Sequence, residues 1–319
     1  MIAAAMTTAN ITTVNVMTAL PPAEFRAGGT DLSERRRSGV SRGPLIDLTA
    51  SPDTSGIAWG ADGAARIGAL MTIAAIGADS RLATTYPGLT ASARGLATPQ
   101  IRHVATLGGN LAQRSRCWYY RNPHIACLKK GGIDCPARAG NHLYHVAFDS
   151  GPCIAPHASS MAVALLAYEA STIDTDRRDG LSVGDLLGDG SDGGRDHALQ
   201  QGEMIRRIVL PAPVAGEHAL YKRAISRSHA EWPLVEVCAR AVVTDGRFRF
   251  VRLAAGGIAP RPLRLLATEA LLLGAEANEE TMLEAARRAT TDANPLPMTG
   301  YKLDLLIGLV NDLLERLAK

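Results

Sequence analysis

The chain has 319 residues, of which 46% are hydrophobic and 20% are charged, and its formal net charge is +3. This composition is typical of a folded chain of about two domains, because disorder requires low hydrophobicity and a high net charge. The small net charge implies no nucleic-acid surface, and no apolar run reaches the roughly 20 residues of a membrane-spanning helix. We therefore expect a sizeable core, no nucleic-acid partner and no membrane span.

The N-terminal segment does not have the pattern of an export signal. Residues 1–20 are apolar and rich in Thr, but they have no basic start and no distinct hydrophobic centre. We therefore expect a cytoplasmic chain. The alternative is a periplasmic chain that is exported together with a partner that bears the signal.

The first part of the chain combines short strands with Ala-rich helices. A short strand is predicted just before Gly28, and an Asp-Gly pair near residue 62 predicts a hairpin turn. Ser159 has the character of an N-cap and begins a helix with apolar spacing. The predicted strands are 45–48, 57–60 and 66–70, and the predicted helices are 71–78, 82–96 and 159–170.

The second part begins after a predicted strand at 205–210, where Pro211–Pro213 is interpreted as a linker. Strands followed by helices indicate an α+β domain with a three-stranded antiparallel sheet. The predicted strands are 220–225, 234–243 and 248–256, and the predicted helices are 263–273, 279–289 and 303–317. We expect two domains, at residues 1–213 and 214–319.

Two Gly-Gly segments indicate a site for phosphate groups. Gly28–Gly29 precedes Thr30 and Gly108–Gly109 precedes Asn110, and each is interpreted as a tight turn after a β-like run. Glycine permits positive φ and close approach of a ligand, and successive N–H groups in such a turn bind anions. Neither segment has Rossmann or P-loop spacing. Together they could hold the two phosphates of a dinucleotide; the alternative is two purely structural turns.

Residues 113–153 differ in composition from the rest of the chain and contain four of the five cysteines. Their spacing fits neither a zinc ribbon nor a ferredoxin run. A local group of thiols in a chain too long to need disulfides nevertheless indicates a metal or iron–sulfur site. Metal–thiolate bonds would also stabilise a segment with so few apolar residues. The alternatives are zinc, and free or disulfide-bonded cysteines in a surface loop. The four are Cys117, Cys127, Cys135 and Cys153.

Several other residues are interpreted without a catalytic role. Cys238 lies in a β-like apolar run and is predicted to be a buried structural cysteine. His142 and His145 are interpreted as solvated or hydrogen-bonded loop residues, since four cysteines already complete a cluster. Trp118 and Tyr119 could shield such a cluster from water. The chain has no recognisable acid–base or nucleophile motif, so we expect no catalytic residue and assign the redox work to cofactors.

These segments have a counterpart in a known family. Residues 27–32, 100–102 and 105–111 resemble the paired FAD-binding motifs of the flavoprotein subunit of molybdenum hydroxylases. That family includes xanthine dehydrogenase, carbon monoxide dehydrogenase and bacterial aldehyde oxidoreductases. Residues 255–262 resemble its Gly-Gly-Val-Ala-Pro-x-Pro signature. The resemblance covers nearly the whole chain from about residue 25.

The resemblance implies a two-lobed FAD-binding domain of the vanillyl-alcohol-oxidase type, followed by a C-terminal α+β domain. It implies that residues 27–32 wrap the pyrophosphate and that residues 106–110 reach the pyrophosphate and flavin. Where the family usually has an Asp that holds ribityl or ribose hydroxyls, this chain has Ser160. The implied FAD contacts are Ala27, Gly28, Gly29, Thr30, Asp31, Leu32, Thr106, Gly108, Gly109, Asn110, Ser160, Ile205 and Lys222.

A subset of the family carries an inserted loop with a 4Fe-4S cluster directly after the second Gly-Gly motif, where residues 113–153 lie here. Residues 116–120 and 151–157 look most like the aldehyde oxidoreductase type, which implies Cys117, Cys127 and Cys135 as iron ligands together with Cys153. The implied protein is the FAD- and 4Fe-4S-containing electron-transfer subunit of a heterotrimeric molybdenum aldehyde oxidoreductase. Its partners would be a large molybdenum-cofactor subunit and a small 2Fe-2S subunit, and its electrons would pass to an external acceptor.

Three alternatives remain for the function of the chain. The first is the same role in a xanthine dehydrogenase or hydroxybenzoyl-CoA reductase type of complex. The second is a stand-alone flavin oxidase, which would oxidise aldehyde by itself. The third is a non-catalytic metal-binding assembly protein with structural Gly-Gly turns.

Overall fold

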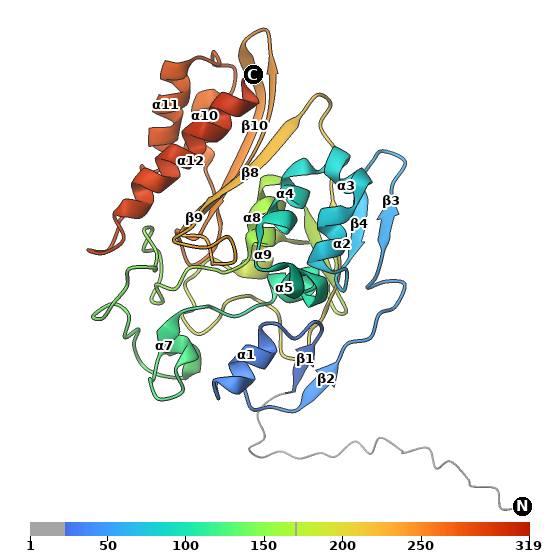
Figure 1. Ribbon diagram of the computed structural model, residues 1–319, viewed down its shortest axis with the longest axis vertical. Helices are drawn as coiled ribbons and strands as arrows, with labels where there is room; N and C mark the ends of the chain where they lie inside the picture. The colour runs from blue at the N-terminus through green and yellow to red at the C-terminus, as the bar shows by residue number, and fades with distance from the viewer. Residues whose placement is uncertain (1–22, 170) are drawn as a thin grey trace, which may run out of the picture.

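A computed structural model describes residues 23–169 and 171–319 (Figure 1). The segment considered above as an export signal lies outside these residues. Among the helices described, none combines the length and apolarity needed to cross a membrane. Helices and sheets are both present throughout, as the α+β prediction requires.

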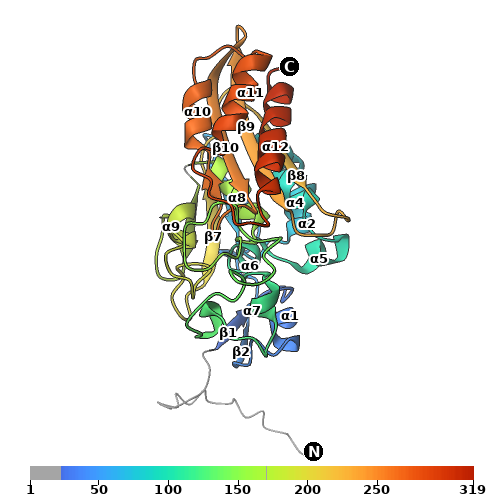
Figure 2. The same cartoon turned by 90° about the vertical axis from the view of Figure 1, so that its left-hand side faces the viewer.

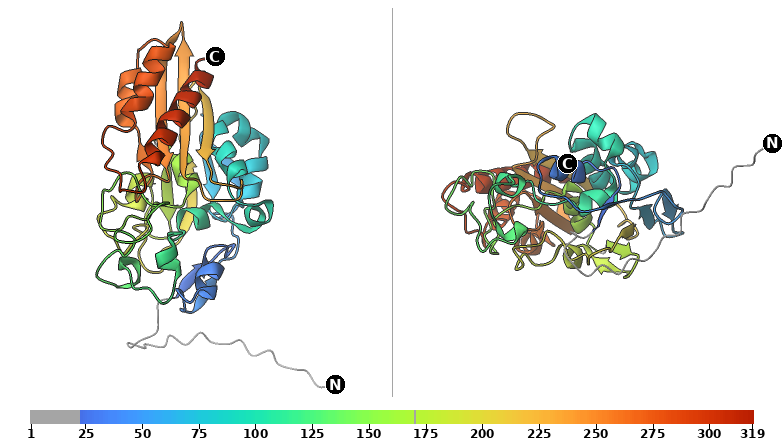
Figure 3. Two further views of the ribbon diagram at one scale, coloured as in Figure 1. Left: turned by 60° about the vertical axis from the view of Figure 1, so that its left-hand side comes forward. Right: turned by 90° about the horizontal axis from the view of Figure 1, so that it is seen from below.

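A small lobe at the N-terminal end consists of two parallel strands and one helix. Strand β1 (Glu24–Arg26) pairs with β2 (Leu45–Asp47), so that the strands predicted before Gly28 and at 45–48 are neighbours. Helix α1 (Leu32–Arg37) follows the first Gly-Gly segment. This lobe lies at the end of the molecule opposite to the C-terminal helices (Figure 3).

The second lobe is a five-stranded antiparallel sheet with the order β3-β4-β7-β5-β6, covered by helices. The strands are β3 (Ile57–Trp59), β4 (Ala65–Gly68), β5 (Thr172–Thr175), β6 (Leu181–Ser182) and β7 (Ile205–Leu210). The helices are α2 (Ile73–Ala78), α3 (Ser80–Thr85), α4 (Pro87–Gly95), α5 (Pro99–Val104), α6 (Leu107–Leu111), α8 (Ser160–Ala167) and α9 (Val183–Leu187).

The local sequence explains several of these boundaries. The predicted hairpin is confirmed as β3 and β4, with Gly63 at φ 85° in its turn. The helix predicted at 82–96 is instead split, because the Asp79 carboxylate caps α3 and Pro87 begins α4. Ser159 is confirmed as an N-cap, since its side chain accepts a hydrogen bond from the amide of Ala162.

The C-terminal domain is a sheet with the order β11-β10-β9-β8 and three helices. The three predicted long strands are present, but a two-residue fourth strand and a later helix start replace the predicted helix beginning at 263. The elements are β8 (His218–Ala224), β9 (Val235–Thr244), β10 (Arg247–Gly256), β11 (Leu263–Arg264), α10 (Leu266–Leu272), α11 (Glu279–Arg288) and α12 (Tyr301–Leu317). The helices cover one face of the sheet (Figure 2), and α4 and α8 pack against its other face.

The segment 113–153 connects α6 to α8 and is mostly irregular. It contains α7 (Trp118–Arg121) and a short 3₁₀ turn at Leu128–Lys130. Its own buried apolar cluster is small and consists of Ala137, Val146 and Ile154. In Figure 1 this segment runs beside α1 and below the C-terminal helices, so it borders both ends of the molecule. We call it the cysteine insertion below.

Candidate functional site

The two Gly-Gly segments meet and line one pocket of about 90 Å³. Their approach depends on Gly28, because a Cβ there would lie 1.7 Å from the carbonyl oxygen of Val104. Gly29 has φ +69°, a conformation that L side chains rarely adopt. The pocket is lined by Phe25, Ala27, Gly28, Gly29, Thr30, Asp31, Leu32, Arg35, Thr106, Gly109, Ala112 and Gln113. The two segments that were paired in the sequence therefore lie side by side in the structure.

The second Gly-Gly segment differs from its predicted form. It follows helix α5 rather than a β-like run, and Gly108 and Gly109 lie inside the short helix α6 rather than in a turn. Thr106 caps this helix, since its hydroxyl accepts a hydrogen bond from the amide of Gly109 at 3.2 Å. Here glycine is needed for space, because a Cβ on Gly108 would lie 2.8 Å from that of Ala69.

Several predicted FAD contacts point away from this pocket. Asn110 is buried and its side-chain oxygen accepts a hydrogen bond from the Ser159 hydroxyl at 2.6 Å, which joins α6 to α8. The hydroxyl of Ser160 lies beside the buried carboxyl of Glu236, which also accepts a hydrogen bond from Tyr221. Burial raises the pKa of Glu236, although these two hydroxyls oppose the effect. Ser160 is therefore part of a buried polar group between the two domains.

Ile205 and Lys222 are also separate from the Gly-Gly pocket. Ile205 is buried in β7, within the core of the first domain. Lys222 in β8 forms an ion pair with Asp312 of α12, with 2.7 Å between the side-chain nitrogen and oxygen. The structure thus brings most of the implied FAD contacts to the Gly-Gly pocket, but Gly108, Asn110, Ser160, Ile205 and Lys222 do not line it.

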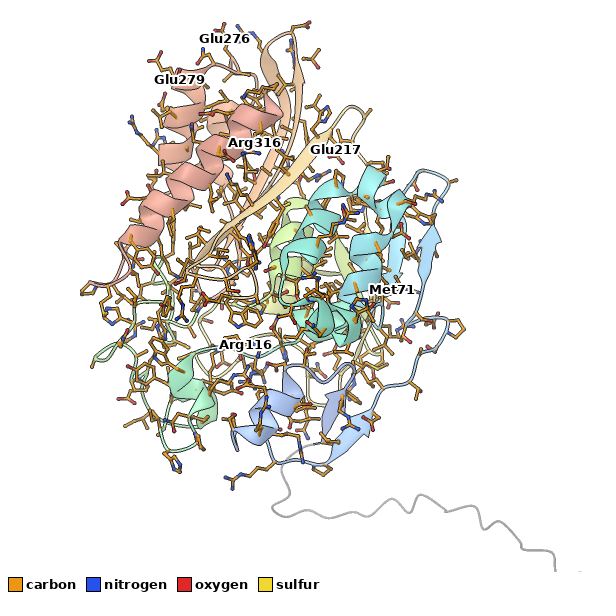
Figure 4. The ribbon with its side chains drawn as sticks, in the orientation of Figure 1. Met71, Arg116, Glu217, Glu276, Glu279 and Arg316 are labelled. Atoms are coloured by element: carbon orange, nitrogen blue, oxygen red, sulfur yellow. The ribbon has the colours of Figure 1, made fainter. Side chains whose placement is uncertain are left out.

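Asp31 connects the Gly-Gly pocket to the cysteine insertion. Its carboxylate accepts hydrogen bonds from Arg35 at 2.9 Å and from Arg121 at 2.7 Å, and it lies 3.2 Å from Arg116. Burial would raise the pKa of this carboxyl, but the neighbouring guanidinium groups outweigh burial and lower it. The pocket is therefore fixed to the insertion through a charged side chain that stays ionised. Figure 4 labels Arg116 near α1.

The four cysteines predicted as ligands line one small cavity of about 10 Å³. None of them is in a disulfide. Burial raises the pKa of Cys117, and the nearby Cys135 and Cys127 add to this effect. A hydrogen bond from Cys153 lowers the pKa of the Cys135 thiol to about 6. Four sulfur donors from distant positions thus converge, although no three His, Cys, Asp or Glu side chains in residues 23–169 and 171–319 are arranged around a single metal ion.

The fifth cysteine, Cys238, is separate and fully buried in β9. A Cβ on Gly88 would lie 2.8 Å from its sulfur, so it packs against the start of α4. This confirms the prediction that Cys238 is a buried residue of the core.

The sequence did not identify how the histidines of the insertion are used. His142 and His145 are both buried, so their interpretation as solvated is wrong and the hydrogen-bonded alternative is confirmed. The Nε2 atom of His145 lies 3.2 Å from the sulfur of Cys117. Nδ1 of His142 bonds to the carbonyl of Ala137. The local sequence does not distinguish His145 from His142, because Cys117 is far from His145 in the sequence.

Beyond Cys117 the surface has an aromatic pocket of about 330 Å³. Trp118, Tyr144 and Trp232 line it, and each of these side chains is about 43% exposed. The guanidinium of Arg116 lies 4.5 Å from the centre of the Trp232 ring. Of the two aromatic residues expected to shield the cysteines, Tyr119 lines the cysteine cavity, whereas Trp118 lines only the aromatic pocket beyond Cys117.

Sequence reasoning also missed pocket residues that flank the glycines. Arg35 and Gln113 line the pocket, and Arg35 contributes a cation next to Asp31. The signal for Arg35 was present, because it follows Asp31 by four residues and such pairs face each other on a helix. The signal for Gln113 was absent, since its position depends on how α6 packs.

The comparisons with known proteins agree with this arrangement. The sequence profile described as "FAD binding domain in molybdopterin dehydrogenase" matches residues 5–213, and that described as "CO dehydrogenase flavoprotein C-terminal domain" matches residues 219–317. The fold and these matches define a flavoprotein subunit of an oxidoreductase. The chain belongs to the FAD-binding subunits of the molybdenum hydroxylase family.

Two curated relatives indicate where in the family the chain lies. It is 33% identical over 283 residues to the aldehyde oxidoreductase FAD-binding subunit PaoB of Escherichia coli K12, covering 84% of this chain and 85% of the relative. It is 35% identical over 99 residues to the xanthine dehydrogenase FAD-binding subunit of Escherichia coli O157:H7, covering 31% and 34%.

Solved structures share the fold. Quinoline 2-oxidoreductase from Pseudomonas putida 86 matches with a TM-score of 0.71 and 21% identity, covering 93% of this chain and 89% of that one. Carbon monoxide dehydrogenase from Hydrogenophaga pseudoflava matches with a TM-score of 0.71 and 20% identity, covering 92% and 89%. These likenesses confirm the predicted FAD-binding α+β fold.

Proposed function

We propose that the chain is the FAD- and 4Fe-4S-containing electron-transfer subunit of a heterotrimeric molybdenum aldehyde oxidoreductase. A large molybdenum-cofactor subunit would oxidise the aldehyde, and a small 2Fe-2S subunit would pass the electrons on. This chain would deliver them to an external acceptor. The observation that carries the proposal is that the two Gly-Gly segments line one pocket, the four cysteines line one cavity, and Asp31 of the pocket pairs with Arg121 of the insertion.

The Gly-Gly pocket supports FAD binding. Because Gly28 and Gly29 have no side chains, a pyrophosphate can approach the backbone closely, and Arg35 adds positive charge at the wall. Thr30 from the first segment and Thr106 from the second also line the pocket. When bound, FAD supplies the ability to accept electrons and to release them to an acceptor.

The cysteine cavity supports an iron–sulfur cluster. Four thiolates are the usual ligand set of a 4Fe-4S cluster, and these four sulfurs already share one cavity without forming disulfides. Lys129 also lines the cavity and would offset part of the negative charge. The donor set fits the cluster, whereas the spacing fits no zinc ribbon.

The comparisons favour an aldehyde over the other substrates. The match to the aldehyde oxidoreductase subunit spans 84% of this chain, whereas the match to the xanthine dehydrogenase subunit spans 31%. The organic substrate would bind to a different subunit, so this argument rests on relatedness. Membership in a family of oxidoreductase subunits argues against an assembly protein.

The test is the cofactor content and the reduction of the complex purified with its partners. We expect about one FAD and about four iron atoms in this chain, and loss of flavin absorbance when an aldehyde is added without oxygen. Reduction by hypoxanthine but not by aldehydes would favour the xanthine type. Aldehyde turnover by the isolated chain would favour a stand-alone oxidase. A folded, colourless and iron-free chain would refute the proposal.

A further inference from the structure

His145 lies between the four cysteines and the aromatic surface pocket. Its side chain is only 3% exposed, and its Nε2 atom lies 3.2 Å from the sulfur of Cys117. Cys117 lines both the cysteine cavity and the aromatic pocket. Among the four cysteines, Cys117 is thus the one that lines both, and the His145 ring contacts its sulfur in addition to the backbone amides of Tyr119 and Tyr120.

The hydrogen bonds available to the His145 ring determine which atom is the donor in its contact with Cys117. Its Nδ1 atom is buried and has no hydrogen-bond partner within the described part of the chain. A neutral imidazole carries one N–H, and a buried N–H without an acceptor is costly. The tautomer with the proton on Nε2 avoids that cost. A cysteine sulfur bound to iron carries no proton, so it can only accept, and Nε2 must then be the donor.

Contacts within the insertion and from the C-terminal domain hold His145 in place. The amide of His145 donates to the carbonyl of His142 at 2.9 Å. The buried amine of Lys302 donates to the carbonyls of Tyr144 at 3.3 Å and Gly257 at 2.6 Å. The imidazole centre lies 6.2 Å from the ring centre of Trp118. The imidazole is therefore fixed against Cys117 by backbone contacts and by aromatic packing.

We propose that His145 donates a hydrogen bond to the sulfur of Cys117 and thereby raises the reduction potential of the iron–sulfur cluster. This inference rests on the proposed function, because it requires the cluster. Reduction adds negative charge to the cluster and its sulfurs, and an N–H donor stabilises that charge, so the reduced form becomes more favourable. No bond is formed or broken, and the histidine transfers neither proton nor electron.

Two variants in the assembled complex separate this role from packing. His145→Phe keeps a planar ring but removes the donor, and His145→Gln keeps an N–H. In a redox titration followed by electron paramagnetic resonance, we expect the midpoint potential of this cluster to fall in His145→Phe and to fall less in His145→Gln. The potentials of the 2Fe-2S clusters in the partner should stay constant and serve as the internal reference.

A measurement on the unaltered protein covers the case in which His145→Phe loses iron. Electron–nuclear double resonance on the reduced cluster should detect a solvent-exchangeable proton, and labelling histidine with ¹⁵N should add a nitrogen coupling. An unchanged potential in an iron-replete His145→Phe variant, or no such couplings in the unaltered protein, would overturn the inference while leaving the cluster intact. Absence of iron from the unaltered protein would instead refute the cluster and this inference together.

Discussion

The C-terminal domain and the cysteine insertion are stabilised by different forces. The domain has an extensive buried core between its sheet and helices, with Val237, Leu253 and Val310 fully buried. The insertion has a three-residue apolar cluster of its own, contributes Ala147 and Phe148 to the core of the C-terminal domain, and also makes ion pairs. These ion pairs are Arg121 with Asp31, Lys129 with Asp196, and Arg138 with Asp149.

This difference determines what each region needs in order to fold. Burial of apolar area gives the C-terminal domain its stability without any ligand. The insertion instead depends on its neighbours and on whatever its thiols bind, because ion pairs alone contribute little net stability. Changes to the thiols and charges should therefore affect the insertion far more than the C-terminal domain.

The largest effect is expected from the cysteines. Replacing Cys127 with Ser weakens a soft thiolate ligand, so the variant should lose most of its iron and its insertion should become protease-sensitive. Cys117→Ser, Cys135→Ser and Cys153→Ser should behave alike. Cys238→Ser is the matched control, since it is buried in β9 and should keep the iron. Iron and acid-labile sulfide are measured, and equal iron in Cys127→Ser and the parent would contradict the assignment.

Loss of FAD is expected when the Gly-Gly pocket is changed. Gly28→Ala would place a Cβ 1.7 Å from the Val104 carbonyl oxygen, which must push the two segments apart. Gly29→Val adds strain at φ +69°, and Gly109→Val clashes with Thr106, whose hydroxyl lies 2.9 Å from the new Cβ. Released flavin is measured by fluorescence.

The control for backbone strain in these glycine variants is Gly180→Ala. Gly180 has φ +72°, but nothing lies within 4 Å of the position that a Cβ would take there, so the variant should retain FAD. An unchanged FAD content in both Gly28→Ala and Gly29→Val would contradict the assignment of this pocket as the FAD site.

Asp31→Asn should weaken the connection between the pocket and the insertion. It removes the carboxylate that Arg35, Arg116 and Arg121 share, although Glu24 and Glu34 remain as partners. Because Asp31 is only partly buried and these partners remain, the expected cost is below the roughly 3 to 5 kcal/mol for breaking a fully buried ion pair. We expect protease cleavage in the insertion at lower temperature than in the parent, while the C-terminal domain stays resistant. Asp47→Asn, which removes an exposed ion pair with Arg26, is the control. Equal cleavage of both variants would refute the role of Asp31.

Acid should destabilise the side of the molecule near the insertion before the C-terminal domain. Burial lowers the pKa of both His157 and His197 to about 4 from the usual value of 6.5. The unfolded chain therefore binds more protons between pH 6.5 and 4, and stability falls as the pH falls through that window. A shift of this size corresponds to on the order of 3 kcal/mol for each histidine.

The measurement for this pH dependence is limited proteolysis between pH 7 and pH 4. Cleavage near the insertion should appear first, and His157→Phe should reduce its pH dependence. His218 and His229 in the C-terminal domain are exposed, and their replacement with Gln should change nothing. Cleavage of the insertion and the C-terminal domain at the same pH would contradict the expected difference in their acid stability.

The smallest effect is expected at Lys222. Its ion pair with Asp312 is partly exposed, so Lys222→Met should cost less than about 1 kcal/mol in thermal unfolding. FAD content should stay unchanged, because the side chain points to α12. A shift in the flavin absorption spectrum of this variant would instead support the contact with the isoalloxazine that the family resemblance implies.

The sequence predicted those features that depend on a short local pattern of residues. The two Gly-Gly segments meet at one pocket, the hairpin at Asp62 forms and the four cysteines line one cavity, and each was noticed in the sequence because glycine and cysteine have few alternative uses in such patterns. The form of the second Gly-Gly segment was predicted wrongly. Thr98 and Pro99 are a cap and a first helical residue, and this signal for α5 was overlooked.

The remaining site features depend on contacts between distant parts of the chain. Lys222 pairs with Asp312, and His145 contacts Cys117, across separations that no local pattern encodes. The Ser160 hydroxyl faces Glu236 for the same reason. These positions follow from how the C-terminal sheet packs on the first domain, so a single sequence supplies the residue types but not their partners.

Under the proposed function, the position of Asp31 would couple the two cofactor sites. It lines the Gly-Gly pocket and holds two arginines that belong to the cysteine insertion. Coupling between two binding events is reciprocal, so whatever an ordered insertion adds to the affinity for FAD, bound FAD adds to the ordering of the insertion. Cofactor loading during assembly would then be cooperative under the proposed function: a chain that has acquired one cofactor would be a better acceptor for the other.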